Sequence, residues 1–149
     1  MTIVAVSGGF DPLHVGHINL LREAKHFANA HNGKLLVILN NDNWLRAKKG
    51  FTFMPEKERE AVLRATKYVD DVVITSHQAK PSDMSVCKEL ERLKPTHFFN
   101  GGDRRPDLDP VPEVELCRKL GIEMIYNVGG QKVQSSSVLT KKASDAQKQ

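Results

Sequence analysis

A glycine-rich turn between an apolar run and an amphipathic segment constrains this chain more than any other feature. Residues 2–6 form a short β-branched apolar run that predicts a buried strand. Residues 18–30 carry apolar side chains at helical spacing, and Asn32-Gly33 ends that pattern. The turn, residues 8–17, has the sequence Gly-Gly-Phe-Asp-Pro-Leu-His-Val-Gly-His. The sequence therefore predicts a strand–loop–helix unit with two histidines where unpaired backbone N–H groups and the helix dipole favour an anion.

Strand and helix patterns alternate along the rest of the chain. Strands separated by helices predict a parallel sheet with right-handed crossovers, which binds ligands beyond the carboxyl ends of its strands. We expect an α/β fold: a single Rossmann-like domain over residues 1–140, with a five-stranded parallel sheet and helices on both faces, and a polar, flexible tail over residues 141–149. The expected strands are 2–7, 35–40, 71–75, 97–100 and 122–127, and the expected helices are 17–31, 55–67, 82–93, 110–119 and one starting near residue 135.

The length, net charge, hydropathy and cysteine spacing of the chain limit the class of protein but do not identify a ligand. The chain has 149 residues, enough for one domain with a core, and a net charge of +4 that suits a polyanion. No apolar run approaches a membrane span and no signal-peptide layout is present, so we expect no membrane partner. Cys87 and Cys117 lack metal or redox spacing, which predicts packing residues and a cytoplasmic protein.

Two other classes are disfavoured by what the sequence lacks. No RNP-type aromatic motif, basic helix or zinc module appears, so nucleic acid is an unlikely partner. The first turn lacks the Gly-x-Gly-x-x-Gly spacing of a dehydrogenase.

The histidine pair is the first candidate site. His14 and His17 are three residues apart, which places both rings on one side of a helix start. Gly16 has no side chain, so a phosphate can approach the backbone there. The alternative is two surface histidines in a first turn. The glycine turn and the preceding strand favour the functional interpretation.

Three other segments are candidates, each with a structural alternative. The basic stretch that contains Lys48 and Lys49 is either a solvated loop or a phosphate ligand. The glycine turn at residues 101–103 lets the backbone pass close to a flat ring or is a plain turn. The serines at residues 135–137 cap a helix, and their hydroxyl and N–H groups are placed to bind phosphate.

At these motifs the chain resembles the HxGH nucleotidyltransferases. More narrowly, it is similar to the cytidylyltransferase-like group, which includes glycerol-3-phosphate cytidylyltransferases and the adenylyltransferase domain acting on heptose phosphates. The resemblance covers nearly the whole chain, because the separate motifs recur in the right order.

The resemblance implies roles for individual residues. His14 and His17 would contact the α-phosphate, and Lys49, which we favour over Lys48, would neutralise the leaving pyrophosphate. The family's arginine before the serine segment is missing, so Lys132 is expected to replace it. The remaining nucleotide-binding residues implied are Gly8, Gly9, Phe10, Asp11, Gly16, Gly101, Gly102, Asp103, Ser135, Ser136 and Ser137.

Roles at the second substrate are less defined. Asp11 and Asp42 would contact metal, ribose or substrate, with no ground to choose among these. Arg59 would touch phosphate or a partner subunit, with a surface arginine as the equal alternative. Arg104 would grip a phosphorylated acceptor substrate or pair with a neighbouring aspartate.

The implied activity is transfer of a nucleoside monophosphate from a nucleoside triphosphate to a small phosphorylated alcohol or sugar, with release of pyrophosphate. We favour CTP, and ATP with a heptose-type sugar phosphate is the alternative. Mg²⁺ would travel with the triphosphate, and a homodimer is expected. A non-catalytic nucleotide- or nucleic-acid-binding protein is the alternative of another class.

Overall fold

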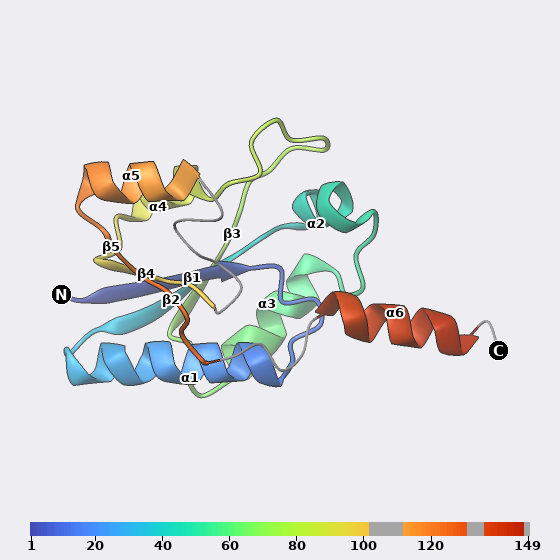
Figure 1. The fold of residues 1–149 in the computed structure, drawn as a ribbon, viewed down its shortest axis with the longest axis horizontal. Coiled ribbons are helices and arrows are strands. Elements are labelled where there is room, and N and C mark those ends of the chain that lie inside the picture. The colour runs from blue at the N-terminus through green and yellow to red at the C-terminus, as the bar shows by residue number, and fades with distance from the viewer. Residues whose placement is uncertain (102–111, 131–135, 148–149) are drawn as a thin grey trace.

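The computed structural model describes residues 1–101, 112–130 and 136–147, and the side chains of residues 136–138 and 147 are outside the description. Strands and helices alternate along the chain, as the sequence predicts (Figure 1). The strands are β1 (Ile3–Gly8), β2 (Lys34–Leu39), β3 (Asp71–Ile74), β4 (His97–Phe99) and β5 (Glu123–Ile125). The helices are α1 (Val15–Ala30), α2 (Asp42–Lys49), α3 (Glu56–Ala65), α4 (Cys87–Leu93), α5 (Pro112–Leu120) and α6 (Ser136–Gln147).

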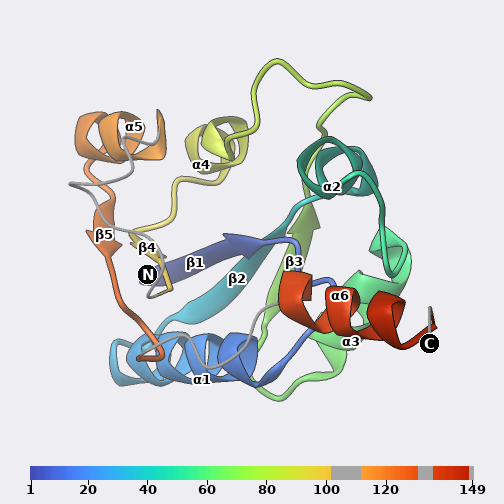
Figure 2. The same cartoon turned by 45° about the vertical axis from the view of Figure 1, so that its right-hand side comes forward.

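The strands form one parallel sheet in the order β3-β2-β1-β4-β5. The register pairs Ile3 with Lys34 and runs through Gly8 opposite Leu39. After β1 the chain turns to α1 on one face, and after β4 it continues to α5 on the opposite face (Figures 1 and 2). The order of the strands therefore reverses between β1 and β4, where a parallel sheet opens its ligand crevice. The predicted fold class is confirmed.

Alternation along the central strands divides the core between the two faces. Val4 and Val6 point into the cluster beneath α1 and α3, whereas Ala5 points into the cluster under α4 and α5. Because both faces are covered, β1 and β2 are nearly continuous runs of buried apolar residues. This layering fixes the loop that follows β1 at the carboxyl edge of the sheet.

Two helices differ from the predicted ones for local reasons. The helix expected from residue 82 begins at Cys87, because Asp83 accepts hydrogen bonds from the backbone N–H and the hydroxyl of Ser85 and holds a turn there. The second difference is α2, which is not among the expected helices and ends at Lys49, where Gly50 caps it in the left-handed conformation.

The boundary at residue 140 falls inside α6. The helix runs through Gln147, so residues 141–147 of the expected polar, flexible tail are helical, and the division at residue 140 stays a prediction. Alanine, lysine and glutamine are good helix formers, and no glycine or proline interrupts them. Figure 1 shows α6 leading away from the sheet.

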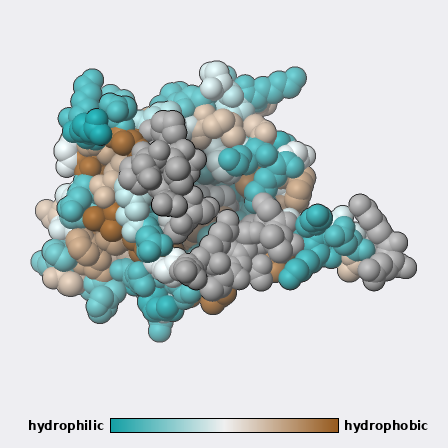
Figure 3. Space-filling view, viewed as in Figure 1, coloured by the Kyte–Doolittle hydropathy of each residue, from teal (hydrophilic) through white to brown (hydrophobic). Residues whose placement is uncertain are grey.

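The face of the molecule shown in Figure 3 is neither uniformly hydrophilic nor uniformly hydrophobic. Hydrophilic residues lie around the outline of the face shown in Figure 3, and an apolar area lies over the end of the molecule that holds β4 and β5. Within the described ranges, no helix combines the length and the apolar character needed to cross a bilayer.

Gly33 provides a test of how tightly α1 joins the sheet. A Cβ atom at this position would lie 2.1 Å from the carbonyl oxygen of Thr2, which accepts a hydrogen bond from Lys34. We expect Gly33→Ala to lower the free energy of unfolding by about 1–3 kcal/mol, because the backbone must shift. Urea denaturation measures this, with Lys34→Ala at an exposed position as the control. An unchanged midpoint for Gly33→Ala would contradict the packing described.

Candidate active site

The two histidines lock each other at the start of α1. His14 is the N-cap residue, and its Nδ1 accepts a hydrogen bond from the N–H of Gly16 at 3.1 Å. The Nδ1 of His17 accepts from the N–H of His14 at 3.3 Å. The rings stack with their centroids 3.8 Å apart, and Phe10 packs edge-on against His17. The pair is therefore a reciprocal capping box built from imidazoles.

This arrangement decides which ring nitrogen carries the proton. A backbone N–H can only donate, so each Nδ1 that receives one must be unprotonated. In a neutral imidazole the proton then lies on Nε2. His14 and His17 thus carry their N–H donors on the nitrogens turned away from the helix backbone. Two such donors beside a helix N-terminus suit phosphate oxygens.

Asp11 ties the histidine loop to the segment between α2 and α3. Its carboxylate, in a residue that is 2% exposed, accepts hydrogen bonds from the N–H groups of Phe53 and Met54, both at 2.7 Å. These bonds use the side chain inside the protein. The structure therefore places Asp11 as an internal anchor and corrects the expectation that it reaches metal or substrate.

Arg59 is buried, which corrects the expectation of a surface arginine or a ligand of phosphate. The residue is 1% exposed, because its guanidinium lies where β1, β2, α2 and α3 meet. Nη1 donates to the carbonyl oxygens of Gly9 and Asn40, and Nε donates to that of Met54. Nη2 forms a 2.7 Å ion pair with Asp42. Asp42 is thereby also a structural partner, and its expected contact with metal, ribose or substrate stays a prediction.

Asn40 carries a polar atom without a partner in the described part of the chain. The residue is 4% exposed, and its Oδ1 accepts no hydrogen bond there. Its backbone is fully used, since the N–H donates to Gly8 and the carbonyl accepts from Arg59. An unpaired buried oxygen costs stability, so it is unusual beside a well-bonded hub.

The basic segment lies on a helix rather than in a loop. Lys48 and Lys49 occupy the last turn of α2, where positive side chains complement the helix dipole. Lys48 is exposed and lies over the ring of Trp44 at 5.9 Å, and Lys49 is half-buried. The indole N–H of Trp44 donates to the carbonyl of Met84. Trp44 therefore fixes α2 against the loop after β3, which leaves the lysines at the helix end.

Phe51 and Phe53 follow the lysines and remain exposed, at 45% and 52%. The backbone N–H of Phe53 is held by the Asp11 anchor, while both side chains are exposed. The structure does not bring them onto the described core.

Several expected nucleotide ligands lie outside the described residues. These are Gly102, Asp103, Arg104, Lys132 and Ser135. Gly101 is described and half-buried just after β4. Ser136 and Ser137 begin α6, as expected of a serine-rich helix start, and their side chains are outside the description.

Gly8 and Gly9 lie where side chains would not fit. A Cβ at Gly9 would come within 2.9 Å of the Leu45 side chain, and one at Gly8 would meet the ring of Phe10 at 3.2 Å. The turn is therefore packed closely against the first turn of α2.

The cysteines are packing residues, as the sequence predicts. Cys117 is buried in the cluster beneath α4 and α5, and burial raises the pKa of its thiol to about 11. Burial also raises the pKa of Cys87. Within the described ranges, no group of three or more histidine, cysteine, aspartate or glutamate side chains is arranged to hold a metal ion.

Sequence reasoning missed one group of residues, in the loop that follows β3. His77 in this loop and Glu89 in the first turn of α4 lie with polar neighbours around a cavity. The position of this loop in the sequence could have indicated the group, because a parallel sheet binds ligands at the loops that follow its strands.

The Arg59 hub gives a direct stability test. We expect Arg59→Met to lower the free energy of unfolding by about 3–5 kcal/mol, because it leaves the Asp42 carboxylate and three carbonyl oxygens without their donor. Arg59→Lys should also destabilise, since an ammonium cannot reach the same oxygens. Guanidinium denaturation measures both. Arg64→Met, at an exposed arginine of the same helix, should change far less. Equal losses for Arg59→Met and Arg64→Met would contradict the hub.

Comparisons with known proteins agree with this geometry. The family model described as cytidylyltransferase-like matches residues 5–141. The FAD synthase of Pyrococcus abyssi is 37% identical over 122 residues, which cover 81% of this chain and 75% of that protein. The FAD synthase of Methanothermobacter thermautotrophicus is 31% identical, over 83% of this chain and 78% of that one.

Two further matches widen the comparison. The bifunctional protein HldE of Koribacter versatilis is 38% identical over 68% of this chain, which spans only 19% of that longer protein. The solved structure of a lipopolysaccharide core biosynthesis protein from Thermoplasma volcanium superposes with a TM-score of 0.68 at 26% identity, covering 89% of this chain and 99% of that one. With its glycine–histidine turn at the head of α1, this chain belongs to the cytidylyltransferase-like family and is a nucleotidyltransferase.

Proposed function

We propose that the protein transfers an adenylyl group from ATP to the phosphate of a small polyhydroxylated molecule and releases pyrophosphate. The observation that carries this proposal is the imidazole capping box. His14 and His17 each accept a backbone N–H at Nδ1, so both place an Nε2–H donor at the head of α1. Donors fixed in this way are suited to charge that grows on phosphoryl oxygens.

The reaction needs no covalent enzyme intermediate. An oxygen of the acceptor substrate's phosphate attacks the α-phosphorus of the triphosphate, and a new P–O–P bridge forms. The bond between the α-phosphorus and the bridging oxygen breaks, and the electron pair leaves with pyrophosphate. The protein aligns the two substrates and stabilises the transferring phosphoryl group.

Other residues are expected to bind the triphosphate, the base and the ribose in this reaction. Lys49, with Lys48 beside it, would offset charge on the leaving pyrophosphate from the end of α2. The N-terminus of α6, with Ser135, Ser136 and Ser137, is expected to hold the β- and γ-phosphates. The segment around Gly101, Gly102 and Asp103 is expected to lie beside the base and ribose, with Lys132 and Arg104 as further expected phosphate ligands.

The described carboxylates at this site do not form a metal cage. Asp11 accepts two backbone N–H groups and Asp42 pairs with Arg59. We therefore keep Mg²⁺ as a companion of the triphosphate, bound through phosphate oxygens, and assign it no protein ligand.

The relatives shift the expected donor from CTP to ATP. FAD consists of a flavin phosphate joined to an adenylyl group, so a protein named FAD synthase supports adenylyl transfer. The sequence alone favoured CTP, which stays as the competing donor. FMN and a heptose-type sugar phosphate are the two acceptor substrates to compare. A cytoplasmic homodimer remains a prediction.

Pyrophosphate release with paired substrates tests the proposal. ATP and CTP are supplied separately with Mg²⁺, each with FMN, a heptose 1-phosphate and glycerol 3-phosphate. We expect turnover with ATP and one of the first two acceptor substrates. Turnover with CTP alone would replace the donor and restore the sequence-based prediction. Absence of turnover in every pair, with no nucleotide-dependent rise in melting temperature, would favour a non-catalytic binding protein.

His17 provides the test of mechanism. We expect His17→Asn to lower the turnover number on the order of 10²–10³-fold, because asparagine can still accept the His14 N–H but lacks the Nε2 donor. His17→Ala should lose the same donor and also weaken the cap. Steady-state assays at saturating substrate measure both, and circular dichroism checks the fold. His26→Ala, at an exposed histidine of the same helix, is the control. A folded His17→Asn protein with near-normal turnover would contradict the proposed mechanism.

A further inference from the structure

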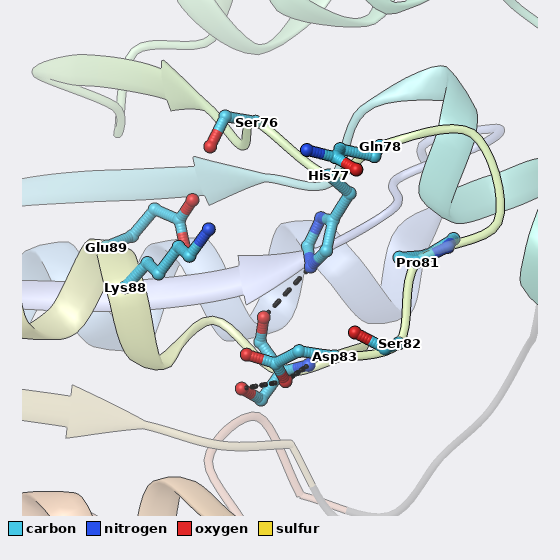
Figure 4. A pocket seen from close by; sticks show the side chains of 9 residues that line it. Ser76, His77, Gln78, Pro81, Ser82, Asp83, Lys88 and Glu89 are labelled. Atoms are coloured by element: carbon cyan, nitrogen blue, oxygen red, sulfur yellow. Dashed lines mark hydrogen bonds between the residues drawn. The ribbon is translucent and has the colours of Figure 1, made fainter.

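A polar cavity of about 170 Å³ opens beyond the carboxyl end of β3. It lies between the loop after this strand and the first turn of α4, and its lining includes Ser76, His77, Asp83, Ser85, Lys88 and Glu89 (Figure 4). We call it the β3–α4 pocket. The lining is almost entirely polar, and the volume suits a fragment of a ligand rather than a whole nucleotide.

Glu89 is the unusual member of this lining. The residue is 5% exposed, and its carboxylate forms no hydrogen bond or ion pair with the described part of the chain. The residue is also part of the lining of the cavity. A buried carboxylate without a partner destabilises a fold. Its position in a polar cavity therefore indicates a ligand that supplies hydrogen-bond donors.

The rest of the lining is held rigidly around this carboxylate. The carbonyl of Ser85 lies 2.9 Å from Nε2 of His77, and a carbonyl can only accept, so Nε2 carries the proton. Nδ1 of the neutral ring then accepts from the hydroxyl of Thr75 at 2.8 Å. Asp83 accepts from the N–H and hydroxyl of Ser85, and these bonds hold its pKa below the usual range. His77 and Asp83 thus build the wall, and Glu89 is the buried acid of the lining that they leave unengaged.

The β3–α4 pocket is joined to the helix that carries the lysines. The carbonyl of His77 accepts hydrogen bonds from the side-chain amides of Asn41 and Asn43, both at 2.9 Å. The indole of Trp44 bonds the same loop at Met84. Figures 1 and 2 both show this loop rising beside α2. The pocket therefore lies at the carboxyl edge of the sheet and is hydrogen-bonded to the start of α2.

We propose that the β3–α4 pocket binds hydroxyl groups on the carbon chain of the acceptor substrate, with the Glu89 carboxylate accepting their hydrogen bonds. The proposal rests on the proposed function, because it gives a subsite to the second substrate of that reaction. A carboxylate accepts strong hydrogen bonds from adjacent hydroxyls, as acidic residues do for ribose in nucleotide-binding folds. The serine hydroxyls of the lining can donate or accept, which completes a site for a polyol.

The charge balance of the lining favours a neutral polyol over a cation. Lys88 contributes a positive charge beside the carboxylate of Glu89, and the Asp83 carboxylate is already engaged by Ser85. Among the described residues, no three potential metal ligands converge here. FMN and sugar phosphates both carry several hydroxyls next to a phosphate, so the pocket accounts for a feature that the two candidate acceptor substrates share.

Calorimetric binding of two probes to the full chain tests the subsite. D-ribitol 5-phosphate carries the hydroxyls, and n-pentyl phosphate has the same chain length without them. We expect the wild type to bind ribitol 5-phosphate at least tenfold more tightly than pentyl phosphate. Glu89→Gln and Glu89→Ala should reduce that preference about tenfold, with the affinity for pentyl phosphate unchanged. Glu91→Gln, at an exposed position of the same helix, is the control.

Thermal unfolding separates the subsite from a structural role. Glu89→Gln should keep the melting temperature, because the carboxylate forms no hydrogen bond or ion pair with the described residues that the substitution would break. A lower melting temperature, or equal loss of both probes, would overturn the proposal. Binding of neither probe by the wild type would also overturn it, as would a Glu89-dependent thermal shift with MgCl₂ alone.

The outcomes distinguish this inference from the proposed function. Turnover of ATP with FMN that is insensitive to Glu89, together with unchanged probe binding, would overturn the subsite and leave the function standing. Glu89-dependent binding of ribitol 5-phosphate without pyrophosphate release in any pair would support the subsite and contradict the function.

Discussion

The guanidinium group of Arg59 holds together the segments that follow β1 and β2 and the entry to α3, at the carboxyl edge near the histidines. Its three nitrogens donate to backbone oxygens of Gly9, Asn40 and Met54 and to the carboxylate of Asp42. These partners come from the end of β1, the end of β2, the entry to α3 and the start of α2. No apolar side chain can satisfy four oxygens from separate segments, so one buried planar cation is the economical solution. The histidine turn and the lysine helix are positioned through this contact, because both begin at residues that Arg59 binds or neighbours.

A second constraint fixes which ring nitrogen of each histidine in the pair carries the proton. The backbone N–H groups of His14 and Gly16 point at the Nδ1 atoms of the histidine pair. The helix start therefore fixes the tautomer of both rings before any ligand arrives, and it does so with groups that would otherwise lack partners. Preorganised donors need no reorientation as charge develops, which is where electrostatic catalysis gains most. In the proposed mechanism, capping and catalysis therefore use the two different nitrogens of the same imidazole.

The fold and the location of the site were predictable from the sequence, whereas the roles of individual polar residues were not. Strand and helix periodicity predicts all five strands, and the glycine–histidine turn predicts the site after β1, because both signals are local. Arg59 has the sequence context of a surface helix position, since charged residues precede and follow it. Its burial depends on oxygens contributed by segments up to 50 residues away. Asp11 likewise looks like a ligand in sequence and is an anchor in the structure, because its donors come from residues 53 and 54.

The same distinction between local and distant partners applies to the buried polar groups that lack a hydrogen-bond partner among the described residues. The side chains of Arg59, Asp11 and His77 are engaged within the protein. Those of Arg59 and Asp11 join segments far apart in the chain, and His77 does so through its backbone carbonyl, which accepts from Asn41. Glu89 and the Oδ1 of Asn40 are buried, and the described residues offer them no partner. A fold tends to satisfy its buried polar groups, and exceptions concentrate where selection for binding opposes selection for stability. Both exceptions lie beyond carboxyl ends of strands, one at β2 and one at the pocket after β3. At that edge, polar groups that are hydrogen-bonded within the protein surround two groups that the described residues leave without a partner. This pattern is expected of a surface that completes its hydrogen bonds with a ligand.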